Sequence, residues 1–236
     1  AILDASFQVD LNHQDFPELW KLGIYLDEAP SHWKTNSDKY KELAQPIIEM
    51  LESGEAIKTY PALQADLDKI NKVCRELHTE VKEKVLHWMK QGKKVVLLGG
   101  DHSIASADVA GIANHLGHGK VSMIHFDAHA DTGEDQWGAL VGHGTPMRRL
   151  IDEGYVRGDK FLQLGLRGYW PDNKTLAWMR DQGMRSYEMT EIHHRGLNKV
   201  LDESFATLTD GCDGVFLSVD IDVVDPGMAP GTGTPE

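Results

Sequence analysis

The stretch "VSMIHFDAHAD", residues 121–131, decides how the rest of the sequence is interpreted. Its first half is a short run of mostly apolar residues, which is typical of a buried strand. Its second half places Asp127, His129 and Asp131 at every second position, so an extended chain would carry all three on one side. Burying two carboxylates beside an imidazole is costly unless a ligand compensates their charge. The stretch therefore predicts a binding site at the end of a core strand.

Segments with strand and helix character alternate along the sequence. We predict strands at 93–100, 120–127, 161–167, 184–188 and 213–226. We predict helices at 36–53, 62–90, 103–116, 144–154, 173–183 and 196–208. The alternation predicts an α/β fold with a mostly parallel sheet that is covered by helices on both faces. In such sheets, ligands bind beyond the carboxyl ends of the strands.

The composition limits the compartment and the partners. The chain has 236 residues and a formal net charge of −13, so nucleic acid is not an expected partner, whereas a cationic ligand suits this charge. The two cysteines, Cys74 and Cys212, do not indicate a disulfide framework, which favours a reducing compartment. No apolar run has the length of a membrane span, and no signal pattern opens the sequence. We expect a soluble, cytoplasmic protein without a membrane partner.

The two ends of the sequence predict a segment of a longer chain. The sequence opens without Met on "AILDAS", which has helical character, and it closes on "GTGTPE", a loop that follows a strong strand. No internal repeat or low-complexity linker divides the residues between. We therefore expect a single domain over residues 1–236 that is an incomplete part of the natural chain.

Three further polar clusters fall at strand ends or in the loops that follow them. They are "GGDHS" at 99–103, "GHGTP" at 142–146 and "SVDIDVVDP" at 218–226. Because parallel strands end at the same edge of a sheet, these clusters are expected to converge with the first one. Asp220 and Asp222 are expected to share one side of the last strand, while Val219, Ile221 and Val223 point into the sheet.

With His102, the clusters supply four carboxylates and two imidazoles. The carboxylates would repel one another, and divalent cations would remove that conflict. Oxygen-rich ligands supplemented by histidine, without thiolate, favour Mn²⁺, and six ligands exceed the four of a tetrahedral Zn²⁺ site. We therefore predict two Mn²⁺ ions bridged by shared carboxylates and a water molecule, which would supply a hydroxide nucleophile near neutral pH.

Each cluster has a simpler interpretation when it is taken alone. The aspartates of "DAHAD" and "GGDHS" could cap helices, and "SVDIDVVDP" could be a strand with a polar edge and an Asp-Pro turn. The coincidence of all clusters favours a site. For Trp137 and Trp170, in loops after site-bearing strands, substrate binding and ordinary packing stay equally open. Arg167 would orient either an anion or a loop carbonyl, or neither.

Four motifs, in their order along the chain, resemble those of the ureohydrolase family of arginases, agmatinases and guanidinobutyrases. They are "GGDHS", "DAHAD", "GHGTP" and "SVDIDVVDPGMAPGTGTPE". The resemblance is strong over residues 95–236. It implies a three-layer α/β/α sandwich with a mostly parallel sheet, of which the N-terminal strand and the C-terminal part are absent here. It also implies a homo-oligomer, commonly a trimer or a hexamer.

The resemblance also implies a role for each site residue. One Mn²⁺ would be held by His102, Asp127, Asp131 and Asp220. The other would be held by Asp127, His129, Asp220 and Asp222, so that Asp127 and Asp220 bridge the two ions. His143 in "GHGTP" matches the family's mobile histidine that shuttles protons. Asp131 would help to move a proton to the leaving amine.

These implications lead to the hypothesis of a binuclear manganese hydrolase. A hydroxide that bridges the ions would attack the guanidinium carbon of a small guanidino substrate and release urea and an amine. The stretches "HGTP", "QLGLRG" and "GTGTPE" look more like agmatinases and guanidinobutyrases than arginases. Agmatine would yield putrescine, in polyamine metabolism. Arginase, guanidinobutyrase and guanidine hydrolase activities stay open as alternatives.

Two hypotheses of other classes remain. A zinc-dependent deacetylase of acetylated amines would share the sheet architecture, but it would hold one ion beside a Tyr and His pair. An inactive paralogue that serves assembly would be expected to have lost some of the ligands. The doubled, Asp-rich ligand set argues against both.

Overall fold

The computed structural model describes residues 7–8, 12–136, 138–169 and 171–236. The chain divides into two compact units, Ala1–Asp38 and Lys39–Glu236. The first unit contains the 3-10 helix η1 (Leu19–Leu22) and the start of α2 (Ser31–Glu52). The second unit contains the sheet and all the polar clusters discussed above, while the single domain expected over 1–236 stays a prediction.

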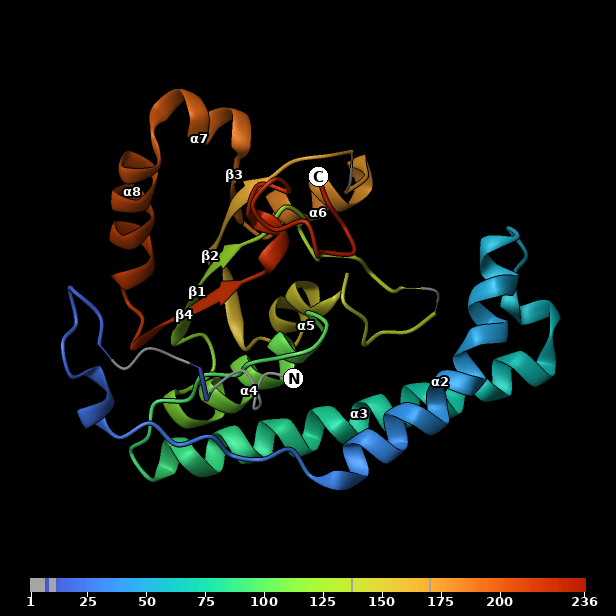
Figure 1. Ribbon diagram of the computed structural model, residues 1–236. Helices are drawn as coiled ribbons and strands as arrows, with labels where there is room; N and C mark the ends of the chain where they lie inside the picture. Colours follow the sequence, from blue (N-terminus) through green and yellow to red (C-terminus); the bar gives the residue numbers. More distant parts are fainter. Residues whose placement is uncertain (1–6, 9–11, 137, 170) are drawn as a thin grey trace. The chain divides into compact units, whose positions relative to one another are not determined.

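A four-stranded parallel sheet forms the centre of the second unit (Figure 1). Its strands are β1 (Val121–Phe126), β2 (Val156–Leu166), β3 (Arg185–Glu188) and β4 (Gly214–Val219). The strand order is β3–β2–β1–β4, so β1 lies between β2 and β4. The predicted parallel sheet is confirmed, and all four strands end at the same edge.

Helices cover both faces of this sheet (Figure 1). They are α4 (Ile104–Leu116), α5 (Pro146–Asp152), α6 (Asn173–Asp181), α7 (Met189–Arg195) and α8 (Leu197–Thr209). Val121 and Met123 of β1 join a buried cluster with α4 and α5, whereas Ile124 joins another with α7 and α8. Because β1 is buried on both faces, its apolar run is nearly continuous rather than alternating.

The long helix α3 (Pro61–Lys90), which follows the 3-10 helix η2 (Ile57–Thr59), packs against α4. At this contact, a Cβ on Gly111 would lie 2.7 Å from the Cβ of Val85 and 2.8 Å from the carbonyl oxygen of Lys82. The glycine therefore permits the close approach of the two helices. No helix in the described parts of the chain combines the length and the apolar character that crossing a membrane requires.

The strand predicted at 93–100 is wrong. Residues 93–99 adopt no regular secondary structure, and Val96 and Leu98 are 79% and 57% exposed. An apolar run forms a strand only where a neighbour accepts its backbone hydrogen bonds. In the described residues the sheet ends at β4, and residues 93–99 do not pair with its outer edge.

The last strand is shorter than predicted. It ends at Val219, and the 3-10 helix η3 (Ile221–Val223) follows, with the carboxylate of Asp220 accepting a hydrogen bond from the N–H of Asp222 at 3.2 Å. Val219 and Ile221 are 61% and 60% exposed, so the prediction that they point into the sheet is wrong. The physical reason is that β4 is an edge strand, part of which no helix covers among the described residues.

Candidate metal centre

The stretch after β1 forms a turn and not a continued strand. The carboxylate of Asp127 accepts a hydrogen bond from the N–H of His129 at 2.7 Å. Asp131 has a positive φ of 51°, which is uncommon for a residue other than glycine. The three residues are therefore brought together by a turn and one left-handed residue, and not by an extended chain.

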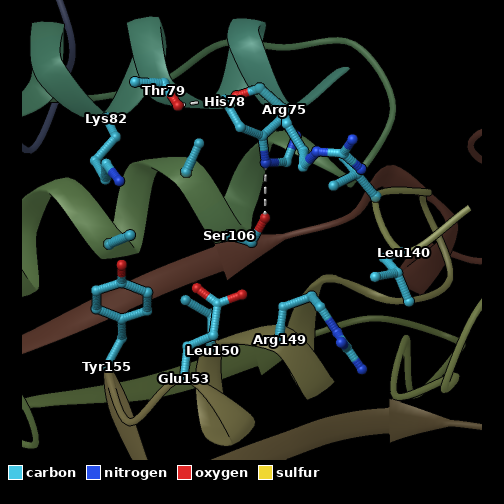
Figure 2. A pocket seen from close by; sticks show the side chains of 13 residues that line it. Arg75, His78, Thr79, Lys82, Ser106, Leu140, Arg149, Leu150, Glu153 and Tyr155 are labelled. Carbon is cyan, nitrogen blue, oxygen red and sulfur yellow. Dashed lines mark hydrogen bonds between the residues drawn. The ribbon is translucent and has the colours of Figure 1, made fainter. Parts of the chain in front are cut away.

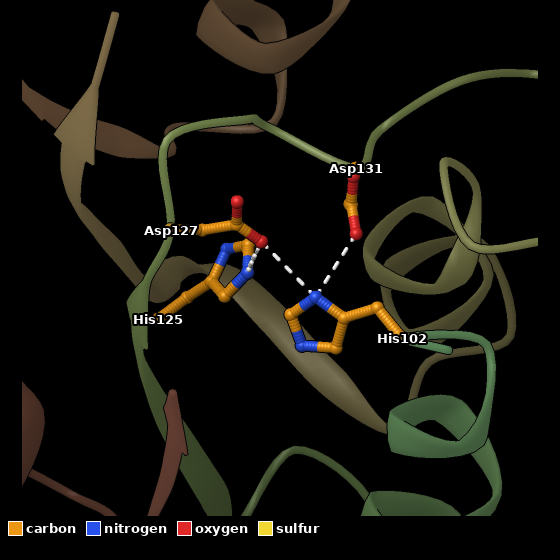
Figure 3. Close-up of side chains that lie close together, drawn as sticks. All are labelled: His102, His125, Asp127 and Asp131. Carbon is orange, nitrogen blue, oxygen red and sulfur yellow. Dashed lines mark hydrogen bonds and ion pairs between the residues drawn. The ribbon is translucent and has the colours of Figure 1, made fainter. Parts of the chain in front are cut away.

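His102, which lies just before α4, points at three carboxylates. Its Nδ1 is 3.0 Å from an oxygen of Asp127, 3.0 Å from one of Asp131 and 3.1 Å from one of Asp220; Figure 3 shows the first two. Its Nε2 lies 2.8 Å from the hydroxyl oxygen of Ser218, which orients the ring. None of the Nδ1 contacts is aligned as a hydrogen bond, so this buried nitrogen has no hydrogen-bond partner in the described residues.

A second group forms around His129. Its Nδ1 is 3.1 Å from Oδ2 of Asp222 and 3.5 Å from Oδ1 of Asp127. Asp222 is buried, and its other oxygen accepts a hydrogen bond from the N–H of Ala128 at 3.1 Å. Asp127 therefore belongs to both groups, with Oδ2 facing His102 and Oδ1 facing His129.

The donor atoms of the two groups fit divalent cations. In each group, atoms from at least three side chains lie within 4.8 Å of one another. The donors are carboxylate oxygens and imidazole nitrogens without thiolate, a set that suits Mn²⁺. Nδ1 of His102, which has no hydrogen-bond partner among the residues that the structure describes, faces the carboxylates, as a nitrogen that shares a cation with them would. The six residues predicted as ligands thus lie in one place.

These contacts shift several pKa values. Burial lowers the pKa of His102, but its three carboxylate neighbours outweigh this and raise it to about 12. Hydrogen bonds to Asp127 and Asp222 raise the pKa of His129 to about 10. Burial would raise the pKa of Asp127, but the imidazoles around it hold the value well below its usual range. Burial raises the pKa of Asp131.

These shifts predict that binding of Mn²⁺ releases protons. Below pH 6.5, the ordinary pKa of histidine, folded and unfolded chains both carry the His129 proton; above it the unfolded chain loses the proton first. The stability of the metal-free protein should therefore fall as the pH rises through about 10. At pH 7 both His102 and His129 therefore carry a proton, and a cation that binds their ring nitrogens must displace both. Titration with Mn²⁺ at pH 7 in the presence of a pH indicator should release roughly two protons per chain. Binding without proton release would contradict this.

His143 lies in the loop between Asp131 and α5. Its side chain is exposed, and its Nε2 is 2.8 Å from the amide nitrogen of Gln136. No contact between described residues joins His143 to the two groups. Trp137 and Trp170 lie outside the described residues. The proton shuttle at His143 and substrate binding at the two tryptophans stay predictions.

Arg167 orders the loop that carries Asp222. Its guanidinium donates to the carbonyl oxygens of Asp222 at 2.6 Å, Val223 at 3.3 Å, Val224 at 3.4 Å and Glu236 at 3.0 Å. Of the alternatives left open by the sequence, the structure therefore favours the contact with loop carbonyls.

Replacing this guanidinium should loosen the loop. Arg167→Leu leaves several carbonyl oxygens without a donor, which should cost about 1–3 kcal/mol of unfolding free energy and weaken Mn²⁺ binding through Asp222. Arg157→Leu is the control, because among the described residues the polar partner of Arg157 is Asp159, in an exposed pair. Thermal unfolding and Mn²⁺ titration measure both effects, and equal behaviour of the two variants would contradict the role of Arg167.

Two buried residues beside the site are not predicted from the sequence. His125 precedes Asp127 by two positions, and its Nε2 lies 2.7 Å from Oδ2 of that carboxylate (Figure 3). Gln163 of β2 lies 3.0 Å from the other ring nitrogen. The signal for His125 was present, because it continues the every-second-position pattern of the following stretch. Nothing in the sequence marks Gln163.

A separate cavity of about 270 Å³ is lined by α3, α4, α5 and neighbouring loops (Figure 2). Arg75, Lys82 and Glu153 are among the charged residues of its wall, and His78 lies 3.2 Å from Ser106 there. It shares no residue with the two groups around Asp127.

The chain is similar to known proteins over much of its length. The profile of the Arginase family matches residues 27–236, a longer range than the motifs alone cover. The chain is 40% identical over 139 residues to a guanidinobutyrase of Pseudomonas aeruginosa, covering 59% of this chain and 42% of that protein. It is 41% identical over 141 residues to the mitochondrial agmatinase of Gallus gallus, covering 59% and 40%. The chain therefore spans less than half the length of these relatives.

A solved structure shows the same fold. The arginase of Bacillus caldovelox aligns with a TM-score of 0.61 and 30% identity, over 70% of this chain and 58% of the arginase. This likeness supports the three-layer arrangement that the motifs imply.

Proposed function

The chain belongs to the arginase family, and on this basis we propose that the protein is a binuclear manganese hydrolase that cleaves a guanidino compound to urea and an amine. The observation that carries the proposal is the position of Asp127. Its two oxygens face two different imidazoles, those of His102 and His129, which is the placement that a carboxylate shared by two cations needs. The proposal concerns the whole protein, to which this chain contributes the proposed metal ligands.

The ligands are divided between two ions. The proposed sets are His102, Asp127, Asp131 and Asp220 for one ion, and Asp127, His129, Asp220 and Asp222 for the other. When bound, two such ions lower the pKa of a coordinated water molecule towards neutrality and clamp the reacting centre. Ser218 contributes by holding the His102 ring so that Nδ1 faces the carboxylates.

The protein's own side chains would attract the substrate and move protons. The four carboxylates create a negative field that suits a guanidinium, whose charge is delocalised and which is therefore a poor electrophile. Asp131 is buried beside His102, so the oxygen that does not hold a cation would be placed to accept a proton near the reacting atoms. His143 is exposed on its loop and is therefore able to exchange protons with solvent.

Agmatine is the substrate that we favour, with urea and putrescine as products. Support comes from the agmatinase and guanidinobutyrase at 41% and 40% identity, and from the net charge of −13, which suits a dication. Arginine, 4-guanidinobutyrate and free guanidine are the alternatives to compare.

The test is Mn²⁺-dependent release of urea by the natural full-length protein from agmatine, arginine, 4-guanidinobutyrate and guanidine. We expect the highest kcat/KM with agmatine. Absence of urea with every substrate would sink the proposal. Metal analysis separates it from the rival deacetylase, because two ions per chain are expected here and one in that case.

Two further proposals concern the oligomeric state, which the family suggests, and the compartment. We propose a homo-oligomer, as a trimer or a hexamer, in the reducing environment of the cytoplasm. The free thiols of Cys74 and Cys212 support the compartment. Light scattering of the full-length protein would measure the assembly.

A further inference from the structure

A row of polar side chains crosses the four strands of the sheet and contacts the two donor groups through Ser218 and His125. The row consists of residues at paired positions on neighbouring strands: Ser218 of β4, His125 of β1, Gln163 of β2 and Ser186 of β3. His125 and Gln163 are fully buried. Ser186 lies 3.1 Å from Gln163 and Gln163 lies 3.0 Å from His125, so three of the four form a continuous hydrogen-bonded chain. Buried polar groups at such a density need a reason beyond packing.

The direction of these hydrogen bonds is set by one backbone carbonyl. The amide nitrogen of Gln163 lies 2.7 Å from the carbonyl oxygen of Ala130. A carbonyl oxygen only accepts, so a rotated amide would place two oxygens against each other. Ser186 then donates its hydroxyl proton to the amide oxygen. The second N–H of Gln163 points at Nδ1 of His125, which must accept it.

With Nδ1 accepting, the ring proton of His125 sits on Nε2. That nitrogen lies 2.7 Å from Oδ2 of Asp127 and donates to it. Oδ1 of the same carboxylate accepts from the N–H of His129 at 2.7 Å. Both oxygens of Asp127 are therefore oriented by one donor each, and each keeps a further lone pair, Oδ2 towards His102 and Oδ1 towards His129.

We propose that Ser186, Gln163 and His125 act as a positioning relay. Ser186 and Gln163 hold His125 as the Nε2–H tautomer, and His125 thereby locks Asp127 in the orientation in which it bridges two cations. His125 is then a positioning residue and not a metal ligand, although it lies within ligand distance of the first group (Figure 3). Both of its ring nitrogens are already engaged, one with Gln163 and one with Asp127. The consequence for metal binding rests on the proposed function, but the tautomer does not.

The tautomer is tested in the metal-free protein by nitrogen-15 NMR of labelled histidines, with the His125 signals assigned by their loss in His125→Gln. We expect a protonated Nε2 and an unprotonated Nδ1 for His125 in the wild type. We expect Gln163→Met, which removes the amide donor, to shift the nitrogen-15 resonance of Nδ1, while Nε2 keeps its proton because it still faces the Asp127 carboxylate. A proton on Nδ1 of the wild-type ring, or no change in Gln163→Met, would overturn the relay.

The second test is Mn²⁺ affinity by titration calorimetry, with the electron paramagnetic resonance spectrum of bound Mn²⁺ as a further readout. His125→Phe and Gln163→Met should weaken binding about tenfold to a hundredfold, whereas His125→Gln, which restores an N–H donor near Nε2, should recover most of the affinity. Ser122→Ala is the matched control, because Ser122 is equally buried on β1 and its hydroxyl donates to the backbone carbonyl of Gly214, away from the two donor groups.

The outcomes separate the two proposals. The relay residues would only fill space if His125→Gln bound Mn²⁺ as weakly as His125→Phe, or if Ser122→Ala lost as much Mn²⁺ affinity as they do. If His125→Phe does not fold, Gln163→Met and the tautomer measurement still decide the question. A wild-type protein that binds no Mn²⁺ would refute the proposed function, and the NMR result would still stand for or against the relay.

Discussion

Asp127→Asn is expected to abolish the binding of two Mn²⁺ ions and to reduce urea release by about a thousandfold or more. Asp127 is the residue that both donor groups share, and its oxygens face His102 and His129 at 3.0 and 3.5 Å. The amide keeps the shape of the side chain but removes the charge. Losing the shared ligand removes several kilocalories per mole of transition-state stabilisation, which corresponds to that factor. Metal content by elemental analysis and kcat/KM measure the two effects.

The control for this variant is Asp225→Asn. Asp225 also accepts a backbone hydrogen bond, from Gly227 at 2.7 Å, but it is exposed and belongs to neither group. It should keep two ions and full activity. Circular dichroism and thermal unfolding establish that both variants fold. A folded Asp127→Asn protein that still binds two ions would disprove the bridging role.

His143→Ala is expected to leave the metal content unchanged and to lower kcat by about 10²–10⁴-fold. The side chain is exposed on the loop before α5 and has no contact with the two donor groups among the described residues, so its loss should not disturb the ligands. If it moves protons between the site and solvent, turnover falls while metal affinity does not. Metal analysis and steady-state kinetics on the full-length protein separate these quantities.

His115→Ala is the matched control, since His115 is another exposed histidine, at the end of α4. It should behave as the wild type. Added imidazole should restore part of the activity of His143→Ala by carrying the proton in solution. Unchanged kcat in His143→Ala would remove this residue from the proton path.

The order of strands and helices could be predicted from the sequence because it depends on local patterns. The apolar run before Asp127 and the helical periodicity of residues 62–90 are properties of consecutive residues. The strand predicted at 93–100 failed for the opposite reason. Val96 and Leu98 have strand-like character, but a strand also needs a pairing partner, and none of the described residues provides it.

For the site, too, one part could be predicted from local sequence patterns and another part could not. The residue types at strand ends indicated a metal centre, because carboxylates and imidazoles on converging loops have few other compatible roles. The condition under which an extended chain would carry them on one side is not met, because the hydrogen bond from His129 to Asp127 and the positive φ of Asp131 turn the chain. The ligands still converge, by a different local geometry.

By itself, the sequence determined the parallel α/β architecture, the identity of the candidate ligands and the edge of the sheet at which they meet. Only the tertiary structure decided how those ligands are oriented. Asp127 is placed between two imidazoles by His125, and His125 by Gln163, a residue 38 positions away on the neighbouring strand. The physical reason is that hydrogen-bond direction depends on which donors and acceptors the register of the sheet brings face to face, and no local pattern records that register.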